Sequence, residues 1–168
     1  MHRGGDGSRA SQGRGRGHGM GHGRRGRGGR GRGGRGGPSA EMRDTFHALL
    51  DGHDAIQRQV EEREDGVATV TTSEDPELVA LIRRHVHDMA AHMQAGGRAR
   101  QWDPLFAALG DHYQEVTLEI EDVPGGVAVV HRGSTPEAVA LVKAHADVVS
   151  AFVAHGFEEA QRSHALPR

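Results

Sequence analysis

The chain has 168 residues, with 26 glycines, 13 histidines, no cysteine and a formal net charge of −2. The lack of cysteine excludes disulfide scaffolds, thiolate metal sites, iron–sulfur clusters and thiol catalysis. No apolar run approaches the roughly 18 residues that a membrane helix needs, so no membrane span is predicted. The small net charge hides two unlike parts: residues 1–40 carry ten basic residues and one acidic residue, whereas residues 41–168 carry 11 basic and 22 acidic residues.

Residues 1–40 form a Gly/Arg-rich low-complexity segment that is predicted to be disordered, because it has no apolar groups to offset the conformational entropy lost on folding. Its repeats are similar to the RGG boxes of RNA-binding proteins, and guanidinium groups suit phosphate geometry. A segment that binds nucleic acid or another polyanion is therefore one interpretation, carried by Arg24, Arg25, Arg27, Arg30, Arg32 and Arg35. Compositional drift, a linker, and a tail that folds over the acidic part stay open as alternatives.

Residues 41–168 are interpreted as a single duplicated domain. A shift of 60 positions aligns residues 46–96 with residues 106–156 without a gap, and 17 of the 51 aligned positions are identical. Two copies are too few for a solenoid, so the duplication predicts one domain with pseudo-twofold symmetry. Repeat one covers residues 41–97 and repeat two covers residues 101–160.

Each repeat is predicted to run helix, strand, strand, helix. Apolar residues at helical spacing predict a first helix over 41–54, and alternating residues from Val116 to Glu121 predict a strand. Turn signals at Asp65-Gly66 and Gly125-Gly126, where glycine supplies a positive φ, precede return strands over 67–72 and 127–132.

The last helix of each repeat is predicted from its capping signals. Asp75 and Thr135 each precede a proline, which fits the first position of a helix, so helices are expected over roughly 76–95 and 136–157. The predicted fold class is α+β: a four-stranded antiparallel sheet with helices covering one face.

The ten histidines outside the Gly/Arg-rich segment are the main candidates for chemistry, and the duplication relates His85 to His145. Neutral imidazole binds copper, zinc or haem iron, and a thioether adds a soft ligand. A shared metal site is predicted from His85, His145, His53, His112, Met89 and His92. The alternative is that these histidines are core residues that hydrogen-bond the backbone or a carboxylate. The remaining histidines of the domain are expected to be exposed and without a role: His47, His87, His131, His155 and His164.

No HExxH, P-loop, nucleophile-elbow or CxxCH motif is present. The sequence therefore favours a non-enzymatic binding protein, with a transition metal or haem as ligand. The alternative is an interaction protein whose tail binds a polyanion while the domain docks a protein partner.

Three segments carry a resemblance to a known family. They are the string from Thr71 to Pro76 leading to His85, the string from Gln101 to Phe106, and the string from Leu141 to His145 continuing to Ala160. They resemble a family of small, uncharacterised two-repeat bacterial proteins that are often exported. The resemblance implies an envelope location and a binding role. No secretory signal is visible, so the sequence by itself places the chain in the cytoplasm by default.

Overall fold

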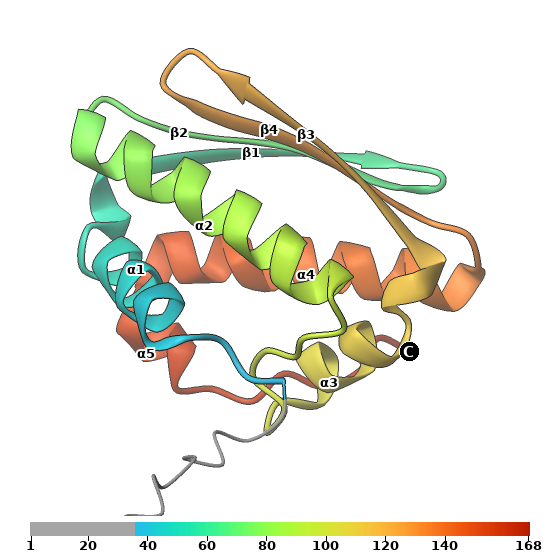
Figure 1. Ribbon diagram of the computed structural model, residues 1–168. Helices are drawn as coiled ribbons and strands as arrows, with labels where there is room; N and C mark the ends of the chain where they lie inside the picture. Colours follow the sequence, from blue (N-terminus) through green and yellow to red (C-terminus); the bar gives the residue numbers. More distant parts are fainter. Residues whose placement is uncertain (1–35) are drawn as a thin grey trace, which may run out of the picture. The chain divides into compact units, whose positions relative to one another are not determined.

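Four antiparallel strands in the order β1-β2-β4-β3 form the sheet of the protein, in a computed structural model that describes residues 36–168. The strands and helices follow the predicted order in both repeats, which confirms the α+β fold class (Figure 1). Their bounds are α1 Ala40–Asp51, β1 Ile56–Arg63, β2 Gly66–Ser73, α2 Pro76–Gln94, α3 Pro104–Asp111, β3 Val116–Val123, β4 Gly126–Gly133, α4 Pro136–His155 and α5 Phe157–Ala160. The six tail arginines proposed to bind a polyanion lie outside the described residues.

Side-chain caps start the main helices where the sequence predicts them. The Asp75 carboxylate accepts from the backbone N–H of Glu77, and the Thr135 hydroxyl accepts from that of Ala138. Each cap satisfies a backbone donor that has no partner inside the helix. Ser39 caps α1 in the same way, so the folded part of the chain reaches back into residues predicted to belong to the tail.

The hairpin glycines have a different role from the predicted one. Only Gly125 has a positive φ, of 77°, whereas Gly66 and Gly126 lie within the strands. A Cβ on Gly66 would lie 1.9 Å from the carbonyl oxygen of His131, and a Cβ on Gly126 would lie 1.9 Å from that of Thr71. These two glycines are therefore required by the close approach of β2 and β4.

The strand pairing has the symmetry of the duplication. Thr69 of β2 pairs with Val129 of β4, its own repeat-related residue 60 positions later, so the pseudo-twofold axis passes between them. The hairpins also bond across the axis: Ser73 N–H donates to the carbonyl of Gly125, and Gly133 N–H donates to that of Asp65. Both hairpins are thus needed to complete one sheet.

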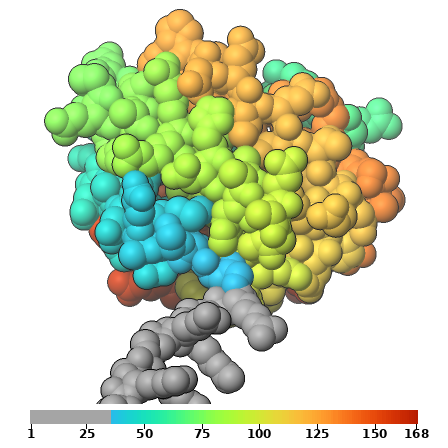
Figure 2. Space-filling view, viewed as in Figure 1, coloured from blue at the N-terminus to red at the C-terminus, as the bar shows by residue number. Residues whose placement is uncertain are grey.

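The helices cover one face of the sheet, and the long helices cross to the opposite repeat (Figure 1). Arg83 of α2 lies 3.9 Å from Asp122 of β3, and Lys143 of α4 lies 3.5 Å from Glu62 of β1. These two ion pairs are related by the 60-residue shift. Exposed pairs of this kind contribute little stability, so they serve here as markers of the crossing. Figure 2 shows α1 and α2 packed side by side on one side of the domain.

Within the described residues, α4 is the one helix long and apolar enough to cross a membrane. A core helix passes the same test, and α4 buries a row of side chains against the sheet and α3, including Leu141, Val142 and Phe152. Its apolar character is explained by this packing.

Candidate functional site

Three of the six predicted metal ligands are hydrogen-bonded at separate places. His53 Nδ1 lies 2.8 Å from the carbonyl oxygen of Val153, and His92 Nε2 lies 3.0 Å from that of Arg98. His112 Nδ1 lies 3.1 Å from a carboxylate oxygen of Glu115, which also accepts from the Thr135 hydroxyl. These three imidazoles hydrogen-bond neighbouring segments to one another. This agrees with the alternative interpretation, in which the histidines bond the backbone or a carboxylate.

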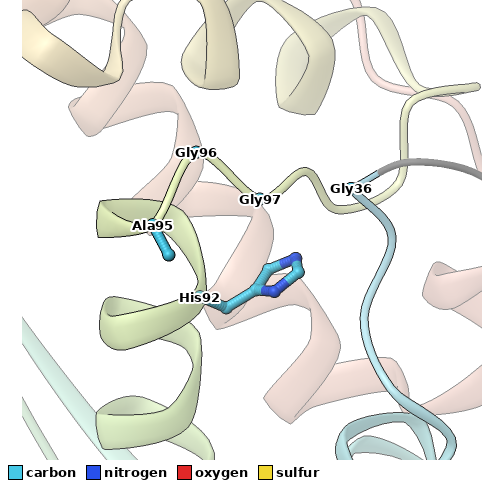
Figure 3. Close-up of a pocket in the computed structure, with 5 residues that line it drawn as sticks. All are labelled: Gly36, His92, Ala95, Gly96 and Gly97. Atoms are coloured by element: carbon cyan, nitrogen blue, oxygen red, sulfur yellow. The ribbon is translucent and has the colours of Figure 1, made fainter.

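His92 also borders a shallow hollow of about 410 Å³ at the end of α2, together with Gly36, Ala95, Gly96 and Gly97. Figure 3 shows its ring pointing from the helix toward the backbone at Gly97. A Cβ on Gly97 would lie 2.4 Å from this ring, so the imidazole packs tightly against the turn that ends α2. Among the residues that line the hollow, His92 carries the one polar side chain, and its Nε2 already faces the carbonyl oxygen of Arg98.

The other predicted pair, His85 and His145, does lie in one layer beneath the sheet. Each imidazole packs on the phenylalanine that the duplication assigns to it: the ring centroids of Phe46 and His85 are 5.7 Å apart, and those of Phe106 and His145 are 5.5 Å apart. Phe152 lies between the two phenylalanines, 5.6 Å from Phe46 and 6.3 Å from Phe106. Met89 lies one turn along α2 from His85 and is half-buried.

His131 completes this layer, and the expectation that it is an exposed residue without a role is wrong. Its side chain shares the face of β4 that holds the buried Val127 and Val129, and its ring centroid lies 5.7 Å from that of His145. The signal was present in the sequence, because residues 127, 129 and 131 point to the same side of a strand. The expectation that His47, His87 and His155 are exposed is confirmed.

Arg58 brings a positive charge into the same interface. It points inward from β1, donates from Nε to the Ser150 hydroxyl at 3.2 Å, and donates from an Nη to the Thr71 hydroxyl at 2.8 Å. We call the set of six residues the polar cluster: Arg58, Thr71, His85, His131, His145 and Ser150.

The two repeats differ most clearly in chemistry at this cluster. The residues 60 positions from Arg58 and Thr71 are Leu118 and His131, and Ser150 corresponds to Ala90. Strand pairing preserves these relations, since Arg58 pairs with Thr71 and Leu118 pairs with His131. The hydrogen-bonded arginine is therefore present in one half of the duplicated core and absent from the other.

The electrostatics of the cluster keep its imidazoles neutral. Burial lowers the pKa of His85 to about 4, and burial with the nearby Arg58 charge lowers that of His131 to about 4. Burial, followed by His131, Arg58 and His85, lowers the pKa of His145 to about 3. Burial alone lowers the pKa of Arg58 to about 10, so the guanidinium stays charged at neutral pH.

Two observations bear on metal binding. His85 Nδ1 is buried and has no hydrogen-bond partner among the described residues. In residues 36–168, however, no three histidine, aspartate or glutamate side chains are grouped so that they could hold a metal ion. Binding of copper, zinc or haem therefore stays a prediction.

A second buried group of charges joins the C-terminal segment to α3. His164 Nδ1 lies 2.6 Å from Asp103 Oδ2, and His164 Nε2 lies 2.9 Å from Glu159 Oε1. The Asp103 side chain is 0 % exposed and also lies 3.6 Å from an Nη of Arg100. The expectation that His164 is exposed and without a role is thus wrong. We call Arg100, Asp103, Glu159 and His164 the C-terminal clasp.

The clasp has the appearance of a catalytic group but lacks a free base. A general base needs a ring nitrogen that can accept a proton from a nucleophile. Both nitrogens of His164 lie within hydrogen-bond distance of carboxylate oxygens, so neither is available to a nucleophile. The arrangement serves structure, and no periodic pattern in the sequence marks His164.

No protein-family model, curated protein or solved structure matches the chain. The resemblance to the two-repeat bacterial family, and the envelope location that it implies, stay predictions.

Proposed function

We propose that the chain is a non-enzymatic binding protein whose ligand site is the polar cluster. The observation that carries the proposal is the Arg58 guanidinium, a half-buried charge that forms no ion pair with a carboxylate in residues 36–168. Moving a charge out of water without an opposite charge costs several kcal/mol. A bound ligand is one way to compensate that cost.

Access supports the same proposal. Arg58, His131, His145, Thr71 and Ser150 are all half-buried, so solvent reaches part of each residue. The cluster thus combines polar groups in a low-polarity interface with partial exposure to solvent. The fully buried Leu105 and Leu141 of the apolar core nearby offer neither property.

The proposal is tested by a binding screen on the full chain, using Cu(I), Cu(II), Zn(II), haem and inorganic phosphate, with titration calorimetry and thermal unfolding as readouts. We expect one ligand to bind more tightly than about 1 μM, or roughly −8 kcal/mol, and to raise the midpoint of unfolding. Binding of that ligand should weaken in the His85→Ala/His145→Ala double variant and persist in the exposed-site control His155→Ala. If no ligand reaches that affinity, or if the double variant binds it equally well, the proposal is wrong.

A second candidate function rests on the uncovered face of the sheet. No helix among the described residues packs on that face (Figure 1), and its centre carries the outward residues Ala68, Val70, Ala128 and Val130. Val70 is 37 % exposed. This surface suits a protein partner, while the basic tail binds a polyanion, as in the interaction-protein alternative.

This second candidate predicts polyanion binding that weakens steeply with salt, since each neutralised phosphate releases counterions. Substituting glutamine for Arg24, Arg25, Arg27, Arg30, Arg32 and Arg35 in the full chain should abolish binding to single-stranded RNA. Binding that is insensitive to salt or to these substitutions would reject it.

A further inference from the structure

We infer that the ligand of the polar cluster is a small oxyanion, with a carboxylate or phosphate group, held by the Arg58 guanidinium where β1 faces α4. This inference rests on the proposed function and names the chemical class of its ligand. Four observations support it: the free donors of Arg58, the contrast with the other arginines, the signs of the surrounding charges, and the break in repeat symmetry.

The first observation is the hydrogen-bond inventory of Arg58. The guanidinium has five N–H groups, of which one bonds Ser150 and one bonds Thr71. The Ser150 hydroxyl donates its own hydrogen to the carbonyl of Ala146 at 3.0 Å, so toward Arg58 it acts only as an acceptor. The other three N–H groups of Arg58 have no protein acceptor among the described residues. Arg58 is on an edge strand and keeps part of its surface exposed, so a small molecule can reach these donors.

The second observation is a comparison with the other half-buried arginines of the described chain. Arg63, Arg83, Arg98, Arg100 and Arg132 each form an ion pair with a carboxylate. Arg58 has only two neutral hydroxyl partners. The protein therefore compensates its half-buried guanidinium groups as a rule, and Arg58 departs from that rule.

The third observation is the sign of the charges around the cluster. Arg58 comes from β1, His131 from β4, His145 from α4 and His85 from α2, and their interactions with one another are repulsive when protonated. Among the described residues, Asp88 is the one carboxylate that acts on these groups, and it acts on His85. An oxyanion is attracted to Arg58, whereas a metal cation placed near it is repelled. Two oxygens of a carboxylate or phosphate also match the fork of a guanidinium.

The fourth observation is that repeat two has apolar residues at the positions equivalent to Arg58 and Ser150. Leu118 takes the place of Arg58 in repeat two, and Ala90 takes that of Ser150. Packing of this interface therefore does not need the guanidinium or the hydroxyl. Their presence in one half is explained if Arg58 holds a ligand and the Ser150 hydroxyl orients its guanidinium.

The test compares the full chain with Arg58→Leu, which copies the residue of the other repeat, and with Arg63→Leu, which removes an ion-paired arginine from the same strand. Inorganic phosphate and sodium acetate are titrated at constant ionic strength, and Zn(II) and Cu(I) are titrated separately. We expect phosphate or acetate to bind the full chain and Arg63→Leu equally well, and to bind Arg58→Leu at least tenfold more weakly. All three proteins keep the arginine-rich tail, so phosphate binding by the tail contributes equally to each and does not affect the comparison.

Equal affinity of Arg58→Leu for the anion would overturn the inference. Binding of Zn(II) or Cu(I) at the histidines without any anion binding would also overturn it, while leaving the proposed function intact. Absence of binding in every titration would reject both. Urea unfolding checks that Arg58→Leu is folded. Arg58→Lys is a second variant, which keeps the positive charge. Because one ammonium group cannot offer two parallel N–H bonds, we expect Arg58→Lys to bind the anion more weakly than the full chain does.

Discussion

The polar cluster and the C-terminal clasp both take ionisable groups out of water, but they balance charge differently. In the clasp, His164 is held between the carboxylates of Asp103 and Glu159, and Arg100 adds a cation beside Asp103. In the polar cluster, the Arg58 charge acts on the imidazoles of His131 and His145, and Arg58 has no carboxylate partner among the described residues. The two groups lie in the same domain, so one fold contains both ways of burying charge.

Burial of charge has two different consequences in this fold. Where opposite charges meet, removal of one partner leaves the other uncompensated and the structure weakens. In the polar cluster the imidazoles are neutral at pH 7, so they do not balance the charge of Arg58, and its guanidinium is available for a ligand.

The largest expected effect is the response of the polar cluster to acid. Its histidines have pKa values of about 4, 4 and 3 in the folded chain, against 6.5 in the unfolded chain, so the unfolded state binds more protons as the pH falls. Their neutral forms stabilise the fold fully above pH 6.5, and that stability is lost as the pH falls toward 4. At pH 5 the loss is about 2 kcal/mol for each histidine, which removes a large part of the stability of an ordinary domain.

This prediction is checked by urea unfolding at pH 7, 6 and 5. His131→Thr, which restores the residue of the other repeat, should reduce the dependence of the unfolding free energy on pH. Ser150→Ala keeps all three imidazoles and should retain it. Stability that is constant between pH 7 and 5 would show that the imidazoles are not held neutral by the fold.

The next largest effect is expected in the clasp. Asp103→Ala removes a fully buried carboxylate that lies against His164 Nδ1 and an Nη of Arg100, and it removes the cap of α3. We expect a loss of about 3 to 5 kcal/mol in the unfolding free energy. Asp111→Ala is the matched control, because its 69 % exposed carboxylate pairs with Arg98 at the surface. A loss of more than about 1 kcal/mol for the control, or an equal loss for both variants, would contradict the assignment.

A smaller difference in stability is expected between variants of Arg58 and Arg100. Arg58→Leu replaces an uncompensated charge with the apolar residue of the other repeat, so we expect unfolding free energy to stay within about 1 kcal/mol of the wild type or to rise. Arg100→Leu breaks an ion pair and should cost about 2 kcal/mol. Both changes are measured by urea unfolding at pH 7. A large loss of unfolding free energy in Arg58→Leu would mean that the hydrogen bonds of Arg58 to Ser150 and Thr71 are required for stability.

Much of the fold follows from the sequence, because the duplication, the alternation in the strands and the capping residues Asp75 and Thr135 are local signals. His131 and Arg58 were also within reach, since their inward positions follow from strand alternation. Helical spacing instead favoured His53, His92 and His112, whose rings bond the backbone or a carboxylate elsewhere.

The clasp was beyond such reasoning. His164 follows the last helix, in a segment with no period, and its partners Asp103 and Glu159 are 61 and 5 residues away. Only the three-dimensional path of the C-terminal segment brings them together. His85 and His145 were predictable in part. The duplication shows that their positions are equivalent, but the positive charge near them belongs to Arg58 of β1, which is far away in the sequence.

The most direct test of the account is the pKa of His131, measured by NMR titration of its imidazole in the full chain and in Arg58→Leu, each with and without phosphate. We expect a pKa of about 4 in the full chain, a higher value in Arg58→Leu because the nearby positive charge is gone, and a rise on adding phosphate only where Arg58 is present. A His131 pKa that changes neither with Arg58 nor with phosphate would contradict the claim that the polar cluster carries an uncompensated charge available to a ligand.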